Sequence, residues 1–187
     1  MGEIKSAWEI AQEKVEKLGK LSPNEIKKKS EEKFALIGQA IADKYLGGLD
    51  LWQLEVELDK YKSEEKATLK ESVASKLVQA IELGNYERLS RIMEGIAYLK
   101  QGKAVREIDD EIKQLFQEYN QVEQEGSEKL EKLAREILHQ LRISGSAIGS
   151  VNPKALGEGK QDLEQLAQPY RERLEPLKQK LIDLPLE

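Results

Sequence analysis

One apolar stripe constrains the fold of this chain more than any other feature of its sequence. From Lys103 onward, apolar residues alternate at spacings of three and four residues over about two and a half heptads. This stripe, which we call the seam, consists of Val105, Ile108, Ile112, Leu115, Tyr119 and Val122. On an α-helix the spacing places these side chains on one face, as in a coiled coil. The sequence therefore predicts a long helix that pairs with another helix, and the partner we expect is a second copy of the chain.

The seam is interrupted at Gly126. Beyond it the apolar series resumes as if four residues had been inserted, at Leu130, Leu133, Ile137 and Leu141. An unbroken helix over 103–142 would form a coiled-coil arm about 60 Å long, at 1.5 Å per residue. A break at Gly126 and Ser127 would instead give two antiparallel helices. The sequence leaves both arrangements open.

The rest of the chain has the composition and periodicity of helices. Charged residues make up 35% of the chain and aromatic residues 5%, a balance typical of long amphipathic helices. Besides a short helix after Asp50, the apolar periodicity predicts helices over 3–18, 23–46, 63–84, 86–101 and 161–184. We therefore expect an all-α fold, in which residues 1–187 form a single domain. This domain should be an elongated helical bundle with a coiled-coil-like long helix or a helical hairpin.

Local signals mark several helix starts. Asp50 with Gln53 predicts one N-terminal cap, and Asn85 predicts another in a helical hairpin that turns at Gly84. The short helix after Asp50 is more apolar than its neighbours, so we expect it to be buried on two sides. Its apolar residues are Leu51, Trp52, Leu54, Val56 and Leu58.

A glycine-rich loop is predicted over 143–160, between the long helix and the last one. Its backbone amides and hydroxyls suit a cradle for a small anion or a partner peptide. The candidate residues of that cradle are Gly145, Ser146, Gly149, Ser150 and Asn152. A flexible connector is the competing interpretation. The C-terminal helix over 161–187 should be bent, because Pro169 and Pro176 each remove a backbone donor.

Motifs for catalysis or metal binding are weak. Glu136 and His139 have the Glu-x-x-His spacing of di-iron carboxylate bundles. However, His139 is the only histidine, and it projects away from the side of the helix that carries Ile137. We expect no metal, no cofactor and no catalytic residue, and a carboxylate metal-binding bundle enzyme remains the alternative.

Charge and cysteine content limit the classes of partner. The net charge is −5 with both signs interleaved, which offers no concentrated basic surface for nucleic acid. The apolar stretches are too short to span a bilayer. The absence of cysteine excludes disulfides and thiolate metal sites and suits a reducing cytoplasm. We therefore expect a cytoplasmic protein without a nucleic-acid or membrane partner.

The chain opens with the residues MGEIKSAWEIAQEK. This opening resembles the start of a family of small uncharacterised bacterial proteins, a domain of unknown function. The resemblance implies a bacterial cytoplasmic origin and no particular activity. The seam leads us to expect a non-enzymatic helical scaffold or protein-interaction protein that forms a homo-oligomer, with another protein as a further class of partner.

Overall fold

The computed structural model describes residues 23–140 and 157–186 of the chain. Within these ranges the chain forms helices and no strand, which confirms the all-α prediction. The helices are α2 (Pro23–Leu46), α3 (Leu51–Asp59), α4 (Ser63–Gln79), α5 (Tyr86–Leu99), α6 (Lys103–Gln140) and α7 (Gly157–Asp183). None of them is long and apolar enough to cross a membrane.

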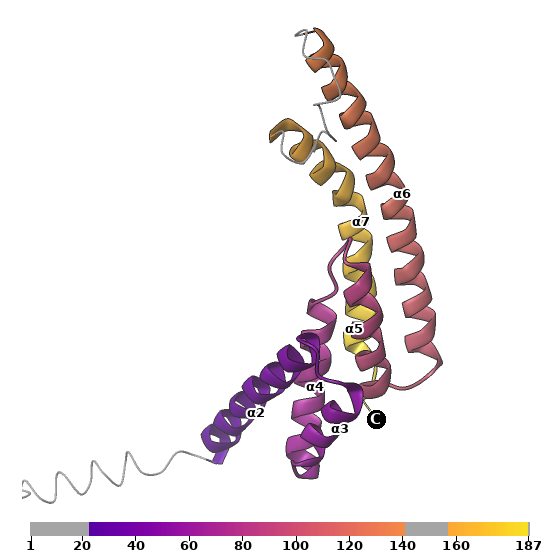
Figure 1. Cartoon of the computed structure of the whole chain (residues 1–187). Helices are drawn as coiled ribbons and strands as arrows, with labels where there is room; N and C mark the ends of the chain where they lie inside the picture. Colours follow the sequence, from indigo (N-terminus) through magenta and orange to yellow (C-terminus); the bar gives the residue numbers. More distant parts are fainter. Residues whose placement is uncertain (1–22, 141–156, 187) are drawn as a thin grey trace, which may run out of the picture.

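The helices form a bundle with a protruding arm (Figure 1). The arm consists of the part of α6 that extends beyond α5, together with the part of α7 that lies beside it. Helix α2 packs along α4, and the short α3 lies against both of them. Helices α6 and α7 run antiparallel and side by side, and α6 extends well beyond the end of α5 (Figure 1). Helix α7 continues through Pro169 and Pro176, and its first turns lean away from the axis of the rest.

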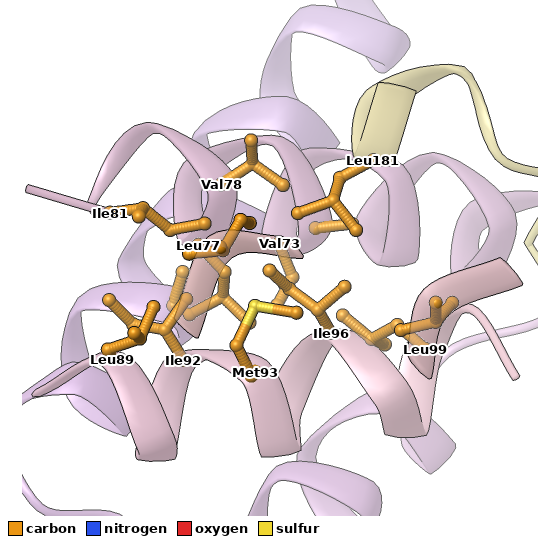
Figure 2. Close-up of a cluster of buried hydrophobic side chains, with 14 of the residues drawn as sticks. Val73, Leu77, Val78, Ile81, Leu89, Ile92, Met93, Ile96, Leu99 and Leu181 are labelled. Atoms are coloured by element: carbon orange, nitrogen blue, oxygen red, sulfur yellow. The ribbon is translucent and has the colours of Figure 1, made fainter. Parts of the chain in front are cut away.

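The core lies where α4, α5 and the last turns of α7 meet. Figure 2 shows the apolar side chains of α4 and α5 facing each other, with Leu181 of α7 beside them. The largest fully buried side chains are Tyr45, Phe116, Leu54, Leu58, Leu69, Leu77, Ile81, Ile92, Ile96, Leu99, Ile112 and Leu181. Six helices therefore contribute to one continuous core.

Two predicted helix starts are confirmed by their hydrogen bonds. The backbone amide of Asp50 donates to the side-chain oxygen of Gln53 at 3.1 Å, one half of a capping box. The side chain of Asn85 accepts from the backbone amide of Arg88 at 3.3 Å and caps α5. The predicted hairpin of α4 and α5 is also present, although α4 ends at Gln79 instead of Gly84.

The prediction that the short helix α3 is buried on two sides is wrong. Leu54 and Leu58 are fully buried, but Trp52 is 62% exposed and Val56 is 49% exposed. The physical reason is that α3 lies at the edge of the bundle, against α2 and α4. Its outward face therefore has no helix to pack against among the described residues.

A buried lysine fixes the end of α7. Lys100 follows α5 directly and is only 4% exposed. Its ammonium donates to the carbonyl oxygen of Ile182 at 2.6 Å and also to that of Leu184. The last carbonyls of a helix lack partners within the helix, and this side chain supplies one. Burial lowers the pKa of the Lys100 ammonium, while the carboxylates of Glu71 and Asp183 oppose that shift.

Candidate functional site

Helix α6 is one continuous helix from Lys103 to Gln140. Of the two arrangements that the sequence left open, the structure therefore has the unbroken helix and not the hairpin broken at Gly126. Gly126 lies within this helix and faces α7. A Cβ atom on Gly126 would lie 2.7 Å from Cδ1 of Leu166 and 3.4 Å from Cδ2 of Leu163. The glycine that interrupts the seam therefore makes room for the side chains of α7.

The seam is covered by helices of the same chain. Five of its six residues are buried, and Val122 is half-buried. Helix α5 covers it near Phe116, whose ring meets that of Tyr86 edge-on at 5.4 Å. Helix α7 covers it near Tyr119, whose ring centroid lies 5.6 Å from that of Tyr170. We expected a second copy on these residues; because they are buried within one chain, an interface between copies has to use other residues.

The same side of α6 continues beyond the part that α5 covers. Five turns of about 3.6 residues separate Leu115 from Leu133, and also Tyr119 from Ile137, so each pair lies on one side of the helix. Leu115 and Tyr119 are buried, whereas Leu133 is 54% exposed and Ile137 is 49% exposed. Leu166 of α7, which packs at Gly126, is 37% exposed. We call Leu133, Ile137 and Leu166 the distal strip.

The distal strip is exposed because α5 does not extend as far as α6 does. The end of α5 nearest the strip is its N-terminus. The hydroxyl of Tyr86, the first residue of α5, donates to the carbonyl oxygen of Phe116 at 2.6 Å. Beyond this point α6 has only α7 beside it in the described part of the chain (Figure 1). Ala134 and Ala167 are buried there. A pair of helices can bury the surface between them, but its apolar flank needs a further helix.

Two ion pairs link α6 and α7 in the part of the pair that is nearer the bundle. Arg173 donates to Glu118 at 2.8 Å, and Lys180 lies 3.4 Å from Glu111. The hydrogen bonds from Arg173 and Gln114 keep the pKa of Glu118 below its ordinary value. Burial raises the pKa of Tyr119, which lies under Tyr170. These contacts position α7 on α6 below the distal strip.

The glycine-rich candidate residues Gly145, Ser146, Gly149, Ser150 and Asn152 lie outside the described residues. Their role in binding an anion or a peptide therefore stays a prediction. The predicted loop boundary at Lys160 is corrected, because α7 already begins at Gly157.

The Glu-x-x-His pair does not form part of a metal-ligand cluster in the structure. Glu136 and His139 are both exposed on α6. Among residues 23–140 and 157–186, no three His, Cys, Asp or Glu side chains gather as they would around a metal ion. The candidate functional site on this part of α6 is therefore the exposed apolar surface of the distal strip.

Comparison with known families covers the same helices. The pattern of a family described as a family of unknown function (DUF6657) matches residues 55–183, more than half of the chain. The chain belongs to this family. The DUF6657 match spans most of α3 and all of α4–α6, and it ends with α7 at Asp183. The opening residues that resemble a family of uncharacterised proteins lie outside the matched range. No curated protein and no solved structure matches the chain.

Proposed function

We propose that this DUF6657 protein is a non-enzymatic helical interaction protein that self-associates through the distal strip of its arm. The observation that carries the proposal is the exposed continuation of the buried seam at Leu133 and Ile137. Exposed apolar side chains that share a face at helical spacing are typical of helix-pairing surfaces.

A second copy of the arm is the partner that we propose for this surface. The arm consists of two antiparallel helices with one apolar flank, and two such flanks packed together give a four-helix arrangement. In a dimer with a two-fold axis, the same patch is used on both copies. The distal strip of one copy then packs against the distal strip of the other, so the two strips cover each other.

Charges beside the strip also fit a second copy. Lys129 and Glu136 are exposed, and at about 100° per residue both lie within about 60° of Leu133 around α6. If two α6 helices pack antiparallel about an axis between Lys132 and Leu133, Lys129 of each copy comes opposite Glu136 of the other. This arrangement pairs opposite charges twice and favours the antiparallel orientation.

Light scattering on the purified chain at micromolar concentration tests the proposal. We expect twice the monomer mass for the wild type and the monomer mass for the double variant Leu133→Glu, Ile137→Glu. The helical circular dichroism should be retained, because both side chains are already exposed. Leu36→Glu is the matched control, since Leu36 is 67% exposed on α2, and it should leave the dimer intact. A monomeric wild type, or a dimer that survives the double variant, would refute the proposal.

Charge exchange tests the orientation separately. Lys129→Glu and Glu136→Lys should each weaken the dimer, because each places like charges opposite one another. Together they restore both pairs, so the double variant should regain most of the lost association. Dimer dissociation measured by dilution gives the comparison. If the double variant is as weak as the sum of the single changes, the antiparallel packing is wrong.

We assign no catalytic role to the side chains of the Glu-x-x-His pair. Glu136 and His139 are exposed on a helix surface, without the shielding from water that strengthens catalytic electrostatics. We place the protein in the cytoplasm because a chain without cysteine suits a reducing compartment.

A further inference from the structure

A cavity of about 630 Å³ lies between α2, α4 and the C-terminal end of α7. Its walls combine polar groups of α4 and α2 with the chain that follows α7. Thr68, Ser75 and Glu71 line it from α4, and Gln39 lines it from α2. Leu184 and the residues after it provide an apolar wall. The volume is within the range of ligand-binding pockets for small molecules.

A buried lysine gives this cavity a positive charge. Lys100 lines it and is the only buried charged residue in the described part of the chain. An ammonium group has three N–H donors. Two of them are used by the carbonyl oxygens of Ile182 and Leu184. A ligand that brings an acceptor oxygen would take the third donor.

Charges of the opposite sign lie at the same cavity. The carboxylates of Glu71 and Asp183 line it and act on the charge of Lys100. They would repel a simple anion, and Lys100 together with Lys76 would repel a simple cation. A molecule that carries both a carboxylate and an ammonium satisfies both sets of charges.

We propose that this cavity binds a small zwitterion of the amino-acid or short-peptide class. Its carboxylate accepts from the ammonium of Lys100, and its ammonium lies against the carboxylate of Glu71. The hydroxyls of Thr68 and Ser75 and the amide of Gln39 bind the polar backbone of the ligand. The wall formed by Leu184 and Leu186 packs against an apolar side chain.

Isothermal titration calorimetry on the full chain tests this site. The probes are the common amino acids and the leucyl and glycyl dipeptides at millimolar concentration. Acetate and methylamine at the same concentration represent the two charged ends separately. We expect at least one zwitterion to bind and neither half to do so. If no member of the panel binds, or if acetate alone binds as tightly, the proposal is overturned.

Two variants in the cavity and one control variant outside it test whether the zwitterion binds in the cavity. Glu71→Gln removes one charge from an exposed side chain and should weaken the zwitterion about two- to fivefold, the usual loss for an exposed ion pair. Ser75→Leu fills the cavity from a half-buried position and should abolish binding. Glu82→Gln, on an exposed residue that does not line the cavity, is the matched control. Equal affinity in all three variants would place the ligand elsewhere and overturn the proposal.

Discussion

The ammonium of Lys100 and the carbonyl oxygen of Ile182 lie 2.6 Å apart although 82 residues separate them in the sequence. This contact joins the end of α5 to the end of α7. Helix α7 in turn packs along α6, so the contact lies at the base of the α6–α7 pair. The contact is buried, and a buried polar group left without a partner costs more than an exposed one.

Lys100→Met should therefore lower the free energy of unfolding by about 1–3 kcal/mol, because the carbonyl oxygens at the end of α7 lose their donor. Urea denaturation followed by circular dichroism measures the loss. Lys103→Met is the matched control. The Lys103 side chain is 90% exposed, so this change should stay within about 0.5 kcal/mol. Equal effects of the two substitutions would show that Lys100 does not anchor α7.

Tyr45 should make stability depend on alkaline pH. Its buried hydroxyl donates to the carbonyl oxygen of Arg91 at 2.9 Å, and burial raises the pKa of the phenol above its ordinary value. The folded state thus keeps this proton to a higher pH than the unfolded state does. The corresponding stabilisation is complete below about pH 10, the pKa in the unfolded chain, and is lost as the pH rises through the folded-state pKa.

Tyr45→Phe removes this titration and one hydrogen bond. We expect it to lower stability by about 0.5–1.5 kcal/mol near neutral pH. Above about pH 10 the difference from wild type should shrink. Urea denaturation at a series of pH values gives the comparison. Tyr86 and Tyr119 also have raised pKa values, so the variant should still lose some stability in alkali. A difference that grows with pH would contradict the assignment to Tyr45.

Helices α2, α4 and α5 meet closely at Gly95. A Cβ atom there would lie 2.8 Å from Cε1 of Tyr45 and 2.9 Å from Cδ1 of Leu77, both in the core. Gly95→Ala should therefore lower stability by about 1–3 kcal/mol, although alanine is the better helix former. The loss of stability is measured by thermal unfolding of the variant and the wild type. Ser90→Ala, at an exposed position of the same helix, should be neutral or slightly stabilising.

The sequence predicted local structure well because local structure depends on neighbours along the chain. The bounds of α2 and the caps at Asp50 and Asn85 follow from side chains within a few residues of each helix start. The seam likewise identified the buried side of α6, since helical spacing alone decides which residues share a face.

Burial by distant elements could not be predicted in the same way. A lysine at the end of a helix is usually exposed, so nothing in the sequence distinguishes Lys100 from Lys103. The sequence also gave no reason for Trp52 to be exposed, because the edge position of α3 depends on how α2 and α4 pack. For the same reason the seam was predicted as a surface between copies, although α5 and α7 cover it.

One leucine of the seam and one of the distal strip give the last prediction. Leu115 and Leu133 lie on one side of α6, five turns of about 3.6 residues apart, but Leu115 is 2% exposed and Leu133 is 54% exposed. Leu115→Lys buries a charge without a partner, so it should cost several kcal/mol and unfold much of the protein. Leu133→Lys leaves its charge in water and should keep the fold while it weakens the dimer. Circular dichroism and light scattering on both variants separate the two effects. If Leu133→Lys unfolds the chain as Leu115→Lys does, the distal strip belongs to the core of a single chain and cannot serve as an interface.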